Sequence, residues 1–146
     1  PELDYYSQTD FELLNAKNVS LNKNNETITI SGLRIDKGRY ADGTIGNLSS
    51  EIYNIFLFHS PNFIQYIDDY NVDLYLCGHT HGGQVWPFGY IVRLAYPYLV
   101  GDYKVGGMSL LVSRGTGTWG PPLRLFSPGE INRIVLRAGT ADGNHR

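Results

Sequence analysis

This sequence has little cysteine, little net charge and no long apolar run, and each shortage excludes a class of protein. Its 146 residues hold one cysteine, Cys77, which excludes an internal disulfide framework. The formal net charge is only −2, so we expect no nucleic-acid partner and no strong attraction to an anionic surface. No segment reaches the roughly 18 consecutive apolar residues of a membrane span. A globular domain remains.

The first residues of the chain lack both an initiator methionine and an apolar leader, since they read Pro1-Glu2-Leu3-Asp4. We therefore expect the chain to be a fragment of a longer protein, whose cellular location stays open. The length fits one domain, and 42% of the residues are hydrophobic. We place the domain at 1–138 and a polar tail at 139–146.

The abundance of 17 glycines and 11 tyrosines, together with several β-branched runs, favours a strand-rich domain. The pattern predicts an α/β (α+β) fold with a mixed sheet. Strands are expected at 11–15, in a hairpin over 19–33, at 53–58 and 73–77, in a hairpin over 103–113, and at 131–136. A helix is expected after Pro61, a loop over 36–50, and a loop with a short helix over 86–98.

The segment 53–77 has the pattern of two buried strands joined by a helix. The first strand is a nearly continuous apolar run and ends at His59. Ser60 and Pro61 suit the start of a helix, and the second strand leads to His79. Because the carboxyl ends of adjacent parallel strands lie at one edge of a sheet, we expect His59 and His79 to meet there.

The segment Gly78-His79-Thr80-His81-Gly82-Gly83-Gln84 is the most informative in the chain. Two imidazoles two residues apart on looped backbone can point into one cleft, and glycines allow sharp bends and close approach of a substrate. Imidazole nitrogen binds Mn, Fe, Zn or Ni, whereas carboxylates bridge paired metals. The pattern favours hydrolysis assisted by two metal ions about 3.5–4 Å apart.

Each candidate ligand also has a simpler interpretation. His59 alone reads as an ordinary hydrogen-bonded residue, and His79 and His81 could be plain loop residues. Cys77, His79 and His81 could form a mononuclear zinc site if the backbone stays regular through Gly78. For Cys77 itself the favoured interpretation is a buried, unreactive thiol.

The chain also offers candidates for substrate binding. Arg114 and Arg124 could hold a phosphate through paired N–H donors, or they could form structural salt bridges or be solvated side chains instead. Gly82 and Gly83 could let a substrate approach the backbone. Trp86 and Trp119 could line a groove, although packing beneath the long loops is the favoured interpretation.

The residues 72–84 resemble the C-terminal signature of calcineurin-like metallophosphoesterases, and most closely a bacterial subfamily with the motif GHTHGGQ. Phe56-Leu57-Phe58-His59-Ser60-Pro61 is similar to the histidine motif that precedes it in that family. The late segments Ser113-Arg114-Gly115-Thr116-Gly117 and Pro121-Pro122-Leu123-Arg124 also resemble family elements, as does Pro128-Gly129-Glu130-Ile131. The resemblance covers about residues 27 to 137.

The resemblance implies the C-terminal half of a β-sandwich with flanking helices, and hydrolysis of phosphate monoesters or diesters by a dimetal-activated hydroxide. It implies that His59 and His79 bind one metal and His81 the other. The family's earlier acidic motifs, which carry the remaining ligands and the histidine for the leaving group, do not precede His59 here. We therefore expect an inactive fragment that binds two divalent ions weakly, its partner being the missing N-terminal half.

Two other hypotheses stay open at this point. The chain could be a non-catalytic domain with a single structural metal, or an interaction module. An exposed half-sandwich would also self-associate through its sheet surface. The letters Gly143-Asn144-His145 match part of a missing motif, and we interpret them as coincidence because they lie in the polar tail.

Overall fold

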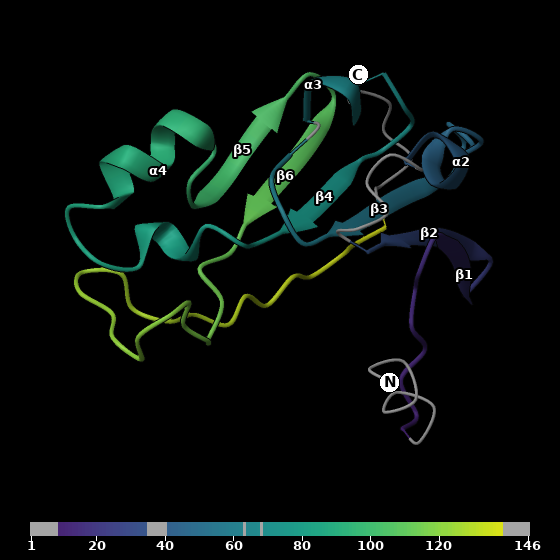
Figure 1. Ribbon diagram of the computed structural model, residues 1–146. Helices are drawn as coiled ribbons and strands as arrows, with labels where there is room; N and C mark the ends of the chain where they lie inside the picture. Colours follow the sequence, from purple (N-terminus) through teal and green to yellow (C-terminus); the bar gives the residue numbers. More distant parts are fainter. Residues whose placement is uncertain (1–8, 35–40, 63, 68, 139–146) are drawn as a thin grey trace.

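The sheet at the centre of the fold is mixed and has six strands. The computed structural model describes residues 9–34, 41–62, 64–67 and 69–138, so the tail at 139–146 lies outside the described residues. The strand order is β1-β2-β3-β4-β6-β5 (Figure 1). The strand pairs β2–β3, β3–β4 and β4–β6 are parallel, and the two outer pairs, β1–β2 and β5–β6, are antiparallel. The predicted mixed α/β architecture is confirmed.

Both outer pairs are tight hairpins. β1 (Lys17–Lys23) and β2 (Glu26–Leu33) are joined by Asn24 and Asn25 at φ 51° and 64°, a conformation that asparagine tolerates and that matches the twist of the strands. β5 (Gly101–Val105) and β6 (Met108–Val112) turn at two glycines. These turns confirm both predicted hairpins.

The centre of the sheet is the predicted strand–helix–strand unit. β3 (Tyr53–Phe58) leads to the short helix α3 (Ile64–Ile67) and then to β4 (Leu74–Cys77). β3 and β4 pair in parallel, with Ile55 opposite Leu74. Both strands therefore end at the same edge of the sheet, and this edge carries the histidines.

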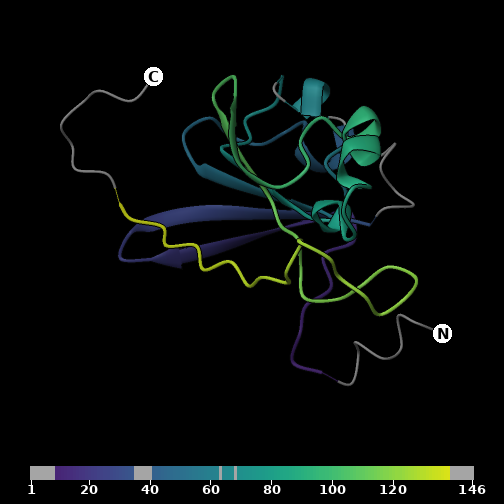
Figure 2. The same ribbon diagram turned by 90° about the vertical axis from the view of Figure 1, so that its left-hand side faces the viewer.

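The main core lies between the sheet and the helices. It combines residues of the strands, of α2 (Ala41–Ile45) and α3, and of the segments that follow these helices, namely Leu33, Ile45, Leu48, Phe56, Phe58, Ile64, Ile67, Val72, Tyr75, Met108, Leu110 and Val112. Burial of these apolar side chains is the main stabilising term. Figure 2 shows the helices on one side of the strands and the segment 123–138 on the other.

Three predicted elements differ in the structure. The described part of the expected loop 36–50 contains α2, because Ile45 is only 1% exposed and anchors that short helix in the core. The expected strand at 11–15 is irregular. The segment 131–136 forms no strand, because it pairs with no described strand and all its residues are exposed, Ile131 by 87%.

The longest described helix is α4 (Gly89–Ala95), which follows the short 3-10 turn η2 (His81–Gly83). It is the short helix expected within 86–98. None of its residues is buried. Within the described ranges, no helix has the length and apolar character needed to span a bilayer.

Candidate metal centre

The turn after β4 has an unusual backbone. His79 and His81 adopt φ of 72° and 51°, and Gln84 adopts 50°, all in the left-handed region that most side chains avoid. Such residues cost about 1–3 kcal/mol each and are held only when the surrounding structure determines them. The turn is held by Thr80, whose hydroxyl donates to the Leu99 carbonyl at 2.5 Å. The surrounding structure therefore fixes the positions of the two imidazoles.

His59 and His79 face one another at the ends of β3 and β4. His79 Nδ1 lies 3.0 Å from His59 Nε2, and the rings cross at 71°. The backbone supports the pairing, because Gly78 N–H donates to the His59 carbonyl at 3.0 Å. The prediction that these two histidines meet is confirmed.

A tyrosine contacts the far side of the His79 ring. Tyr96 Oη lies 3.0 Å from His79 Nε2, so both ring nitrogens of His79 have a defined neighbour. Tyr96 is the residue that ends α4, its N–H donating to the Val92 carbonyl. Its extended conformation suits the position before Pro97. Nothing in the spacing of Tyr96 and His79 along the sequence indicates this contact.

The surroundings of His79 favour its neutral imidazole. Partial burial lowers the pKa of His79, and the nearby His59 and His81 lower it further. A neutral imidazole keeps a lone pair, which metal binding requires. The site is therefore suited to receive a cation at neutral pH.

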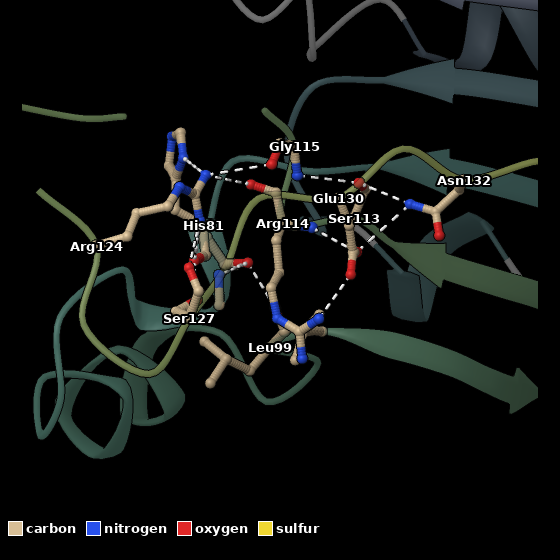
Figure 3. A network of polar contacts seen from close by, with 12 residues as sticks. His81, Leu99, Ser113, Arg114, Gly115, Arg124, Ser127, Glu130 and Asn132 are labelled. Atoms are coloured by element: carbon tan, nitrogen blue, oxygen red, sulfur yellow. Dashed lines mark hydrogen bonds and ion pairs between the residues drawn. The ribbon is translucent and has the colours of Figure 1, made fainter. Parts of the chain in front are cut away.

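His81 is placed differently, inside a polar network with the late loop (Figure 3). Arg124 Nη2 lies 3.3 Å from His81 Nδ1, and Ser127 Oγ donates to the His81 carbonyl at 2.7 Å. Burial lowers the pKa of His81, and so does the charge of Arg124. Since a guanidinium only donates, Nδ1 accepts, and its lone pair faces Arg124.

Arg124 holds the late loop together through its backbone carbonyls. Its guanidinium donates to the carbonyls of His81, Ser127, Arg114, Gly115 and Gly117. These contacts give Arg124 a structural role, although its partners are carbonyls and not the carboxylate of a salt bridge. The signal in the sequence is that prolines and glycines surround Arg124. Because these residues have no side-chain hydrogen-bonding groups, the loop depends on another side chain to fix it.

Arg114 is likewise engaged by the protein. Its Nη1 lies 2.6 Å from Glu130 Oε2, and its backbone N–H donates to Oε1 at 2.9 Å (Figure 3). The backbone bond is the main cause that lowers the pKa of Glu130, assisted by Asn132 and the guanidinium. A role of Arg114 in binding substrate stays a prediction.

Close packing requires glycine at the two positions after His81. Both have positive φ, 63° for Gly82 and 79° for Gly83. A Cβ on Gly82 would lie 2.7 Å from Ser127 Oγ, and one on Gly83 would overlap the backbone of Gly89 at the start of α4. These glycines let the late loop and α4 approach the histidine turn. Their predicted contact with substrate stays untested.

Cys77 contacts the neighbouring strand β6 through its side chain. Its thiol lies against the Leu111 carbonyl at 3.6 Å, and burial raises its pKa to about 12. This matches the interpretation as an unreactive thiol. Among residues 9–34, 41–62, 64–67 and 69–138, no three histidine, cysteine or carboxylate side chains are grouped closely enough to hold an ion. The pair His59–His79 is therefore the part of the candidate centre that this chain assembles.

The glutamine of the motif links the turn to the loop that carries Trp119. Gln84 is buried, its Nε2 donates to the Trp119 carbonyl at 2.7 Å, and its Oε1 accepts from Trp119 N–H at 2.6 Å. The Trp119 side chain is 77% exposed and Trp86 is 58% exposed. The prediction that both tryptophans pack beneath loops was wrong, because the main chain of Trp119 makes the contact.

Comparison with known proteins places the chain among named relatives. It is 39% identical over 118 residues to an uncharacterized metallophosphoesterase of Campylobacter jejuni, covering 75% of this chain and 32% of the relative. It is 47% identical over 84 residues to one of Helicobacter pylori, covering 56% and 23%. It is 32% identical over 145 residues to one of Aquifex aeolicus, covering 92% and 54%. No family model and no solved structure matches.

The coverage of these relatives is partial. The chain spans between about a quarter and about half of the length of these three curated relatives. The alignment with the Aquifex aeolicus protein extends over nearly all of the chain. The likeness therefore includes the sheet and the histidine turn together.

Proposed function

Because this chain belongs to the metallophosphoesterase family, we propose that it supplies the histidine side of a metal-dependent phosphoesterase site. The reaction is the hydrolysis of a phosphate monoester or diester. In this proposal His59 and His79 bind one divalent ion, and His81 binds a second. The carboxylate ligands and the proton donor come from a part of the protein that precedes these residues, and the chain alone is inactive.

The observation that carries the proposal is the 3.0 Å separation of His79 Nδ1 and His59 Nε2. Imidazole nitrogens bind Zn²⁺ at about 2.0–2.1 Å, so two of them on one tetrahedral ion lie about 3.3 Å apart. The two nitrogens are thus within about 0.3 Å of the spacing of neighbouring ligands of a single ion. They come from the ends of two paired strands, which fix that spacing.

The chain meets only part of what such a site needs. A bound divalent ion would lower the pKa of a water molecule and offset the charge of the phosphate. In this proposal the imidazoles of His59 and His79 bind the ion and fix its position. His81 lies two residues from His79 but faces Arg124, so we expect its ring to need release from Arg124 before it can bind.

The experiment measures Mn²⁺ and Zn²⁺ binding and the hydrolysis of bis(p-nitrophenyl) phosphate. In the full-length protein, His59→Ala and His79→Ala should each weaken binding at the first position at least tenfold and abolish turnover. His145→Ala is the matched control and should change neither. The 146-residue chain alone should bind either ion weakly and show no turnover.

Two results would contradict the proposal. Wild-type affinity and turnover in both His59→Ala and His79→Ala would exclude the histidine pair as ligands. Robust hydrolysis by the 146-residue chain would show that no further ligands are needed. A single tightly bound zinc without turnover in the full-length protein would favour a structural metal instead.

A further inference from the structure

We propose that Tyr96 is the positioning residue that holds His79 with its proton on Nε2, so that Nδ1 is the atom that binds metal. This inference rests on the proposed function of the histidine pair and adds a residue to it. The starting observation is the contact of Tyr96 Oη with His79 Nε2 at 3.0 Å, opposite the nitrogen that faces His59. The phenol and imidazole rings cross at 69° with their centres 5.2 Å apart.

The direction of this hydrogen bond decides which nitrogen is available. A neutral imidazole has one N–H donor and one lone pair, and a tyrosine hydroxyl can donate or accept. If Tyr96 accepts from Nε2, the lone pair of His79 lies on Nδ1, beside His59 Nε2. If Tyr96 donates instead, the proton occupies Nδ1, where an ion would have to bind. Histidine ligands commonly donate their second N–H to an oxygen, and Tyr96 Oη is the oxygen at that position.

The position of Tyr96 is set by contacts on both sides of it. Before it, α4 packs on the histidine turn because Gly83 and Gly89 have no side chains to separate them. After it, the carbonyl of Leu99 accepts from the Thr80 hydroxyl at 2.5 Å. Thr80 lies between the two histidines of the turn, so the segment that carries Tyr96 is fastened to the backbone of its target.

The contact also suggests a role for the helix α4. This helix buries none of its residues, and a seven-residue helix has little stability of its own in water. Its described contacts run to the turn η2, and its final residue, Ala95, leads directly to Tyr96. We infer that α4 serves to bring Tyr96 to His79.

The test uses the full-length protein with ¹⁵N-labelled histidine and Zn²⁺ as a diamagnetic probe. Long-range ¹H–¹⁵N spectra of the zinc-loaded wild type should show His79 with a protonated Nε2 and a zinc-bound Nδ1. Tyr96→Phe keeps the ring and removes only the hydroxyl. We expect it to weaken zinc binding about tenfold or more and to speed the exchange of the Nε2 proton with water.

Tyr98→Phe is the matched control, since Tyr98 packs against Tyr103 and not against a histidine. It should leave zinc affinity and the His79 spectrum unchanged, and both variants should keep the melting temperature of the metal-free protein. A protonated Nδ1 on zinc-loaded His79, or wild-type affinity in Tyr96→Phe, would overturn the inference. Neither result would touch the proposed function, which fails instead if His59→Ala and His79→Ala bind zinc like the wild type.

Discussion

His79 and His81 are two residues apart, yet the structure holds them in opposite ways. His79 lies at the edge of the sheet with one ring nitrogen toward His59 and the other toward Tyr96. His81 lies in the network of the late loop, with Arg124 at its Nδ1. We call these two regions the strand-end pair (His59 and His79) and the loop network (His81, Arg114, Arg124, Ser127 and Glu130).

The difference shows how one short motif serves two purposes. The strand-end pair depends on parallel pairing of β3 and β4, which the buried core fixes. The loop network depends on polar contacts from a segment more than 40 residues later in the chain, which bind mainly the backbone of the turn. The first region carries two ligands of the proposed metal site, and the second stabilises the loop beside it.

The largest expected effect follows from a substitution at the junction of the two regions. Gly83→Ala adds a Cβ that overlaps Gly89 at a position of positive φ. We expect a loss of about 3 kcal/mol in the free energy of unfolding, measured by urea denaturation. It should also disturb the strand-end pair, because α4 carries Tyr96. Gly117→Ala, which has open space around its Cβ, is the control and should be nearly neutral.

Removal of the arginine at the centre of the loop network should come next. Arg124→Ala deletes donors to several backbone carbonyls, and we expect a loss of about 2 kcal/mol. The exposed Arg133→Ala should change stability by less than about 0.5 kcal/mol. In ¹⁵N spectra, Arg124→Ala should alter His81 and leave His79 unchanged. Equal changes at both histidines would show that the two regions are one unit.

A smaller effect is expected at the ion pair of the loop network. The backbone N–H of Arg114 holds the pKa of Glu130 below its ordinary value of 4.5. A lowered carboxyl pKa stabilises the fold above the unfolded value, and the contribution disappears as pH falls through the folded pKa. Glu130→Gln should therefore cost under about 1 kcal/mol at pH 7 and nothing in strong acid. A cost that persists at low pH would show that charge is not its cause.

The last prediction concerns the reactivity of Cys77, which belongs to neither region, and involves no change in stability. With its pKa raised to about 12, the thiol should react with iodoacetamide at pH 8 about a thousandfold more slowly in the native chain than in urea. Saturating Zn²⁺ should leave that native rate unchanged. A marked slowing by zinc would place the thiol in the strand-end pair as a third ligand.

The sequence by itself determined the central sheet and the meeting of two histidines. The nearly continuous apolar run at 53–58 and the apolar residues within 73–77, with a helix start between them, favoured parallel strands. Since such strands end at one edge, His59 and His79 had to be neighbours. The asparagine and glycine pairs also fixed both hairpins, because their allowed φ values select the turn type.

Only the tertiary structure decided which side chains contact those histidines and whether the segment 131–136 forms a strand. Tyr96, Arg124 and Glu130 reach the site through contacts between residues far apart in sequence, which no local periodicity records. The segment 131–136 has the alternation of a strand, but a strand needs a partner for its backbone hydrogen bonds, and no described strand supplies one. Local pattern specifies which conformation a segment can adopt, while packing decides what that conformation contacts.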